Sequence, residues 1–335
     1  MKRMTKSMKR HGAAVLWAVC MATAVCLLTV FFPVKAEAAA KTITAGSEAV
    51  RSGDCIYYVG GSRRNNDSII RYDVKKKQKK ILVDARDTGT MGFDTLTISG
   101  GYIYTTWNWS HGSDNVLWYV YRFSKDGKKQ ERLAVGRDPL VINGQIYYQE
   151  ARVVNDPYWG GESSELTGYI CRMKKDGSGK QKVCKIRGSK YSAKLFRWGK
   201  KMLYGECSWD GKLGKKLYDQ TGKSYSTKKF TYRKNRIDGD MYGSKKVSEK
   251  VVGGKYSYYL KTRGGKNRGY TEIYGRNRKT GKESKIARFS SGIHDVYVCG
   301  DHLLAVTYDD ARGATYCLSV NGKNKKKLGS WGWVS

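Results

Sequence analysis

Proline and histidine are scarce in this sequence, which has three prolines and four histidines among its 335 residues. Because proline cannot donate to a strand ladder, its scarcity is compatible with many short strands. Three of the histidines lie beyond residue 40, at His111, His294 and His302. A metal site of three histidines would need these distant segments to converge, so we expect no metal and no cofactor.

Motifs for catalysis are also missing. The sequence has no G-x-S-x-G nucleophile elbow, and we predict no catalytic residues. Glycan-cleaving enzymes need paired carboxylates. The acid clusters that could supply them are Asp309-Asp310, Asp238-Gly-Asp240 and the pair Glu162 and Glu165. A glycan-active enzyme that uses clustered carboxylates, with Asp309 and Asp310 first, is therefore the alternative hypothesis.

The cysteines have no C-x-x-C spacing, so nothing in the sequence indicates zinc or redox chemistry. Six of them lie beyond residue 40, and sequence alone cannot choose among their pairings. Cys171 and Cys184 flank the turn 175–180 symmetrically, so a regular hairpin would place them opposite each other. They form the candidate disulfide, and two buried free thiols are the alternative.

Residues 1–40 have the layout of a secretory signal peptide. Basic residues precede an uncharged, mostly apolar stretch from Ala13 to Val34, and Ala36-Glu37-Ala38 offers small residues at cleavage spacing. The alternative is an uncleaved signal anchor, since that stretch is long enough to span a bilayer. We predict a secreted protein with one domain at residues 41–335, which contacts a membrane only through an uncleaved N-terminal segment.

Acidic residues are few beside basic ones, 29 against 64. Removing the six bases and one acid of residues 1–40 leaves 58 and 28, a formal charge of +30 for residues 41–335. Such an excess concerns partners and solubility rather than fold. For an exported chain it favours an anionic envelope polymer as partner and no specific nucleic acid, although DNA would attract it by the same physics. We expect a monomer.

A short phrase recurs six times at intervals of 44 to 55 residues. Each copy begins with a small turn residue and continues into an apolar or aromatic strand. The copies are SGDCIYY at 52–58, SGGYIYT at 99–105, NGQIYY at 143–148, WGKKMLY at 198–204, GGKYSYY at 253–259 and CGDHLLA at 299–305. Repetition at this period is typical of propellers and solenoids.

Each copy can be divided into four strands, which in the second copy are residues 95–98, 102–107, 116–123 and 130–134. Asp-Gly, Thr-Gly or Asn-Gly between the third and fourth strands supplies the positive φ of tight hairpins. Consecutive apolar residues indicate that both sheet faces are covered, which favours a propeller over a β-sandwich or open solenoid. We predict an all-β propeller of six four-stranded blades, with five or seven as alternatives. Residues 224–246 fit no unit and are extra strands or an insertion.

The strands IYYV, IYTT and IYYQ, followed by IIRYD or YVYRFSKDGKK, resemble a known family. The chain is similar to the bacterial propeller domain described as resembling that of prolow-density lipoprotein receptor-related protein 1. The resemblance covers residues 47–330 and implies an extracytoplasmic β-propeller without assigned catalytic residues. The receptor-type Tyr-Trp-Thr-Asp phrase is absent, so receptor ligands are not carried over.

Lysines gather in the turns between the third and fourth strands, at the outer rim of the predicted ring. Lysine on an outer edge blocks edge-to-edge aggregation. It would also dock the protein onto an anionic surface, with an affinity that falls as salt rises. The residues assigned to this surface are Lys75, Lys76, Lys77, Lys79, Lys80, Lys325, Lys326 and Lys327.

Large aromatic residues gather in the loops between the second and third strands, at the opposite end. Loops on a rigid scaffold often carry binding residues, although such rings also tuck between blades and stabilise the loops. The candidate ligand-binding residues are Trp107, Trp109, His111, Tyr158, Trp159 and Trp209. We predict a non-catalytic binding or scaffold protein associated with the cell envelope, whose partner is an anionic polymer, a glycan or another surface protein.

Overall fold

The computed structural model describes residues 41–61, 67–84, 90–110, 115–155, 160–208, 212–239, 248, 250–263, 270–290, 292–309 and 312–332. The predicted signal peptide lies outside these residues. The chain divides into two units, 1–41 and 42–335, and the fold described below belongs to the second. In the described ranges, no helix is long and apolar enough to cross a membrane.

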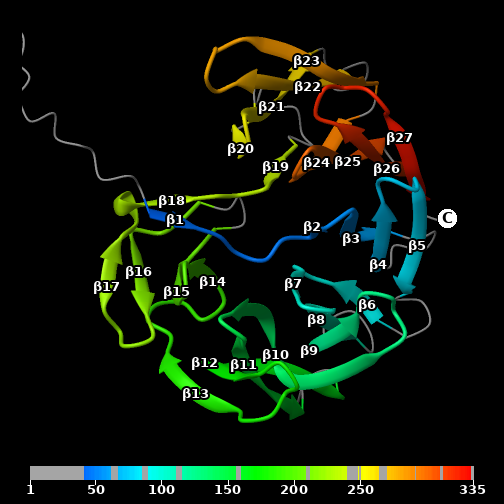
Figure 1. Cartoon of the computed structure of the whole chain (residues 1–335). Helices are drawn as coiled ribbons and strands as arrows, with labels where there is room; N and C mark the ends of the chain where they lie inside the picture. Colours follow the sequence, from blue (N-terminus) through cyan, green and yellow to red (C-terminus); the bar gives the residue numbers. More distant parts are fainter. Residues whose placement is uncertain are drawn as a thin grey trace, which may run out of the picture. The chain divides into compact units, whose positions relative to one another are not determined.

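The fold is all-β, and consecutive antiparallel sheets follow one another around a common centre as a β-propeller (Figure 1). Sheet 1 contains β2 (Ala49–Ser52), β3 (Cys55–Gly61), β4 (Asp67–Asp73) and β5 (Gln78–Val83). Sheet 2 contains β6 (Thr90–Phe93), β7 (Thr97–Ser99), β8 (Tyr102–Ser110), β9 (Val116–Ser124) and the first part of β10 (Gln130–Ile142). Sheet 3 contains the rest of β10, β11 (Gln145–Asn155), β12 (Glu162–Lys174) and β13 (Gln181–Lys185).

The later sheets have the same order. Sheet 4 contains β14 (Ala193–Trp198), β15 (Lys201–Glu206), β16 (Lys216–Asp219) and β17 (Ser224–Ser226). Sheet 5 contains β20 (Val251–Gly253), β21 (Tyr256–Arg263), β22 (Tyr270–Asn277) and β23 (Glu283–Phe289). Sheet 6 contains β24 (Gly292–Cys299), β25 (His302–Asp309), β26 (Arg312–Ser319) and β27 (Lys326–Gly332). The number of blades stays a prediction, because several connecting segments lie outside the described residues.

The recurring phrase forms the same two-residue turn in every sheet, between its first and second strands. In sheet 3, for example, Ile142 pairs with Gln145 across Asn143-Gly144. The first glycine of each such turn has a positive φ, between 57° and 78°, which glycine adopts without strain. The glycines are Gly53, Gly100, Gly144, Gly199, Gly254 and Gly300. Each copy of the repeat therefore consists of a tight turn that needs a glycine, followed by a buried strand.

Apolar clusters join sheets 1 to 4 in succession and sheets 5 and 6, and the first and last sheets also pack on each other. Sheets 1 and 6 share a cluster that includes Tyr58, Leu304 and Leu328. Sheets 1 and 6 share no strand, so side-chain packing joins them, as expected from the sequence. The expectation that every sheet uses contiguous chain is wrong for sheet 6, because β19 (Arg236–Asp238), which precedes sheet 5 in the chain, pairs with β24. Trp331 lies in β27 opposite Gly313, whereas Trp333, the other predicted plug, lies outside the described residues.

Residues 224–246 contain both a fourth strand and an insertion. β17 completes sheet 4, and the chain then forms a short 3-10 helix, η2 (Thr227–Lys229). β18 (Phe230–Tyr232) follows and pairs with β1 (Lys41–Ile43), and β19 (Arg236–Asp238) pairs with β24. Ile43 and Phe230 pack against Phe196 of sheet 4, in a cluster that contains no described residue of sheet 5.

Two chain segments therefore cross the centre of the sheets: residues 42–49, between β1 and β2, and residues 230–238 of the insertion (Figure 1). Thr44 forms a bridge with Arg197 of sheet 4, and Ser47 forms one with Leu96 beside sheet 2. The side-chain amide of Asn235 donates to the carbonyl of Ala49 at 2.8 Å, which ties the two segments together. The centre is thus occupied by ordered backbone.

The predicted pairing of Cys171 with Cys184 is wrong. Both thiols are free. A bulge between Ile170 and Cys171 shifts the register of β12 and β13, so Cys184 lies opposite Ile170 and Cys171 lies opposite Lys182. Because alternate side chains of a strand point to opposite faces, a shift of one residue separates the two sulfurs. Burial, the largest cause, raises the pKa of the Cys171 thiol to about 12.

Candidate functional site

None of the six residues predicted for ligand binding lies in a loop that the structure describes. Trp107 and Trp109 both lie within β8, opposite Tyr119 and Leu117 of β9, so their assignment to a loop is wrong. The strand continues past the predicted end because β6 pairs with it as well. Trp107 is buried, with its ring centroid 4.3 Å from that of Tyr121, and Trp109 is half-buried. The other four candidates, His111, Tyr158, Trp159 and Trp209, lie outside the described residues.

The lysines predicted for an anionic surface are all exposed. Their turns share one construction, in which an Asp or Asn side chain accepts hydrogen bonds from turn N–H groups. Asp73 accepts from the backbone of Lys75 and Lys76 at 3.1 and 2.9 Å, and Asn321 accepts from that of Lys323 at 3.0 Å. The Asp and Asn side chains thereby bind the backbone inside the turns, while the lysine side chains are exposed.

Some of these lysines also have local partners. The Lys75 ammonium lies 2.9 Å from the Asp54 carboxylate. The Lys325 ammonium lies 3.8 Å from the ring centroid of Phe289, and burial lowers its pKa. The Lys326 ammonium donates to the carbonyl of Lys77, which joins the turns of sheets 6 and 1. No ion pair of Lys76, Lys79 or Lys327 is found among the described residues.

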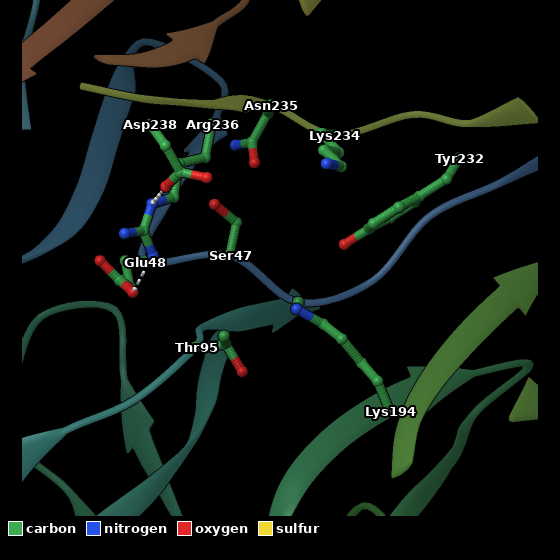
Figure 2. Close-up of a pocket in the computed structure, with 10 residues that line it drawn as sticks. Ser47, Glu48, Thr95, Lys194, Tyr232, Lys234, Asn235, Arg236 and Asp238 are labelled. Atoms are coloured by element: carbon green, nitrogen blue, oxygen red, sulfur yellow. Dashed lines mark hydrogen bonds and ion pairs between the residues drawn. The ribbon is translucent and has the colours of Figure 1, made fainter. Parts of the chain in front are cut away.

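A polar cavity that the sequence analysis did not predict lies at the centre of the sheets, between the two crossing segments (Figure 2). Its volume is about 90 Å³. The lining residues are Gly46, Ser47, Glu48, Thr95, Lys194, Tyr232, Lys234, Asn235, Arg236 and Asp238. Most of them belong to residues 46–48 and 232–238, and sheet 4 contributes Lys194 from β14. The cavity therefore exists because the two segments cross here.

One side of the cavity is a network around Arg236. Its guanidinium lies 2.7 Å from Asp295, 2.9 Å from Asp238 and 3.1 Å from Glu48, measured to the nearest carboxylate oxygen. The Tyr297 hydroxyl donates to Glu48, and His294 Nδ1 lies 2.5 Å from Asp295. Three carboxylates thus share one guanidinium.

The pKa values of this network follow from burial and from these contacts. The hydrogen bond to Asp295 is the largest cause of the raised pKa of His294. Burial raises the pKa of Asp238, against the opposing effect of Arg236. Burial also raises the pKa of Tyr297, so this phenol is neutral and donates a hydrogen bond to Glu48. The network therefore combines three carboxylates with Arg236 and with a histidine whose raised pKa favours its charged form.

The other side of the cavity carries Lys194 and Tyr232. Burial works against the charge of Lys194, but nearby Tyr232 and Asp138 outweigh it and raise the pKa of the amine. Burial raises the pKa of Tyr232, which stays a neutral phenol. Among the described residues, no carboxylate lies within ion-pair distance of Lys194. The cavity thus has chemically different sides.

Asp94 lies behind the cavity, next to Asn108 and near Asp138. The side-chain amide of Asn108 donates a hydrogen bond to the Asp94 carboxylate at 3.0 Å. Burial, assisted by the charge of Asp138, raises the pKa of Asp94 to about 6. In the described residues, no cluster of three or more His, Cys, Asp or Glu side chains is placed to hold a metal ion.

We expect Asp94 to make folding stability fall as pH rises from about 4 to about 6. Its pKa is higher in the folded chain than in the unfolded one, so the folded state binds more protons in this window. Asp94→Asn should remove this part of the pH dependence, worth roughly 3 kcal/mol. Urea unfolding of both proteins between pH 4 and pH 7 measures it, and a constant difference between the two stability curves would contradict it.

The acid clusters considered for glycan cleavage do not form a described pair. Asp309 ends β25, but neither its side chain nor Asp310 is described. Asp238 is bound to Arg236, and Asp240 lies outside the described residues. Glu162 begins β12, where it is exposed, and Glu165 lies 2.7 Å from Arg152.

Solved structures with a similar fold are β-propeller proteins. The acylaminoacyl peptidase in complex with Z-Gly-Gly-Phe-chloromethyl ketone is 10% identical, with a TM-score of 0.51 over 87% of this chain and 52% of that one. The AtxE2 isopeptidase with bound astexin is also 10% identical, with a TM-score of 0.47 over 86% and 53%. TolB from Acinetobacter baumannii is 12% identical, with a TM-score of 0.38 over 83% and 67%. The chain spans about half the length of the two peptidases.

This similarity concerns the fold alone, because the identities are low. Neither the protein-family models nor the curated proteins give a match to the sequence. The resemblance noted from the repeat phrases is thus supported as far as the propeller fold, which the acylaminoacyl peptidase shares.

Proposed function

We propose that this propeller is a secreted, non-catalytic binding protein that docks onto an anionic polymer of the cell envelope. The observation that supports the proposal most directly is the construction of the lysine-bearing turns. Asp or Asn at one position organises each turn internally, as in Asp73, Asp126 and Asn321, and leaves exposed ammonium groups outside. The turns thus present cations on a rigid frame.

The chemistry of lysine indicates the kind of partner. Arginine provides a fixed, bidentate fork, whereas lysine is a mobile point charge on a flexible stem. A surface of lysines therefore suits a linear polymer of repeated negative charges better than a ligand of defined shape. Phosphate is the group that we assign to this polymer, because lysine binds it as a point charge. Acidic polysaccharide and anionic lipid are alternatives for the test.

The test compares two variants with the same loss of charge. In the rim variant, Lys75, Lys76, Lys77, Lys79 and Lys80 are changed to Gln. In the control, five other exposed lysines, Lys185, Lys215, Lys216, Lys229 and Lys250, are changed to Gln. Binding to long-chain polyphosphate, to polygalacturonate and to phosphatidylglycerol vesicles is measured at several salt concentrations.

We expect the rim variant to bind polyphosphate at least roughly tenfold more weakly at 0.1 M salt, since a lysine near an anionic surface contributes about 1 kcal/mol. The control should lose much less. Binding of the unchanged protein should fall steeply with salt, the Debye length shrinking to about 3 Å at 1 M. An equal loss in both variants would show that total charge acts rather than the rim, and preference for polygalacturonate or vesicles would exclude the phosphate polymer.

A further inference from the structure

The two sides of the central cavity carry opposite charge. Figure 2 shows Glu48, Arg236 and Asp238 on one side and Lys194 and Tyr232 on the other, with Ser47 between them. On the acidic side, three carboxylates share the single guanidinium of Arg236. On the basic side, Lys194 has no carboxylate within ion-pair distance among the described residues. Lys234 also lines the cavity, and its charge acts on Asp238. The two sides thus present groups of opposite charge to a ligand.

The walls of the cavity are held by backbone hydrogen bonds, so the two charged sides are kept apart before any ligand arrives. The N–H of Ser47 donates to the carbonyl of Leu96 at 3.2 Å. The N–H of Val298 donates to the carbonyl of Asn235 at 2.6 Å, and the N–H of Gly239 to that of His294 at 2.7 Å. A ligand that fits this spacing loses little affinity to rearrangement of the protein.

The size of the cavity limits the ligand. A water molecule needs roughly 10–15 Å³ of such space, and the cavity has about 90 Å³. It therefore holds about six non-hydrogen atoms. A side chain on the acidic side, Asp238, is exposed, so the cavity reaches solvent there.

We propose that the central cavity binds a small zwitterion, an α-amino acid of the size of glycine, alanine or serine. Its carboxylate contacts Lys194 and the Tyr232 hydroxyl, and its ammonium contacts Glu48 and Asp238. Ser47 and Asn235 supply further hydrogen-bonding groups to the ligand. Both charges are needed, because each of them contacts side chains of opposite charge on its own side of the cavity.

The experiment measures calorimetric binding and melting temperature of the full chain with L-alanine, D-alanine, glycine and serine. Acetate and ethylamine serve as the two half-ligands. We expect at least one amino acid to bind and to raise the melting temperature, and each half-ligand to bind at least about tenfold more weakly, because one charge-assisted hydrogen-bond set is missing. Acetate that binds as well as the amino acids would overturn the proposal, as would the absence of any heat or shift with all four.

Two variants localise the site. Lys194→Met removes the cation, and Tyr232→Phe removes only a hydroxyl, which keeps the test valid if the first variant does not fold. Both should weaken amino-acid binding, the first by at least about tenfold. Lys216→Met, at an exposed lysine, and the rim variant described above should bind the amino acid unchanged. Unchanged binding by Tyr232→Phe and a folded Lys194→Met would overturn the proposed site, whatever the outcome with polyphosphate.

Discussion

Replacement of Arg236 by Met should lower the free energy of unfolding by about 3 kcal/mol at pH 7, since it takes the guanidinium away from the buried carboxylate of Asp295. Asp295, whose side chain is 4% exposed, would then face Glu48 and Asp238 without the guanidinium that lies within 3.1 Å of all three. Urea unfolding measures the loss. At pH 4 the loss should be smaller, because the raised pKa of Asp238 favours its neutral form there.

Arg152→Met is the matched control for this change. Arg152 also lies 2.7 Å from a carboxylate, that of Glu165, but that side chain is 39% exposed and also contacts Lys190, whereas Asp295 is 4% exposed. Exposed ion pairs contribute about 0–1 kcal/mol, so this variant should unfold almost as the unchanged protein does. Glu48→Gln in the Arg236→Met background should restore part of the lost stability. Equal losses for Arg152→Met and Arg236→Met would show that the central network does not stabilise the fold.

Truncation after Lys327 should cost at least about 3 kcal/mol, since removing one buried leucine side chain costs about 2–5. The truncation removes Leu328, which is 5% exposed and packs in the cluster between sheets 1 and 6. It also removes most of β27, whose residues up to Gly332 pair with β26. A protein that melts at the same temperature after this truncation would show that the two sheets stay joined without β27.

A shorter truncation separates two explanations of this effect. Ending the chain after Gly332 keeps every described pair of β27 with β26 and removes Trp333. If packing of Leu328 joins the sheets, this truncation should leave the melting temperature nearly unchanged. If Trp333 is also a plug, as the sequence suggested, the melting temperature should fall here too.

The sheets were predictable because each repeat carries its own turn signal. Gly53 or Gly144 requires a positive φ, and the strand that follows is buried in every copy. The length of individual strands was less predictable. β10 runs from sheet 2 into sheet 3 without a break, since Gly136 allows the crossover where any Cβ would lie 2.3 Å from the carbonyl oxygen of Gln149. No local pattern marks such a strand.

The central cavity could not be predicted for a different reason. Its charged residues come from segments that show no periodicity, such as residues 42–49 and 232–238, and they lie together only in the folded chain. Asp238 was visible in the sequence as part of an acidic pair, but its partner Arg236 and the distant Glu48 gave no signal. The register of Cys171 and Cys184 could not be predicted either, because a single bulge turns a side chain to the opposite face of its strand.

The crossing of residues 42–49 with the insertion has a consequence for the order of folding. The N–H of Arg233 donates to the carbonyl of Ile43, and Asn235 donates to that of Ala49, so these contacts span more than 180 residues of chain. Contacts of such high sequence separation form slowly. During synthesis, the segment before sheet 1 stays without these partners until residue 235 has left the ribosome, whereas each sheet can pair its own strands at once. We therefore expect folding to end with the closing of this central crossing, after the individual sheets have formed.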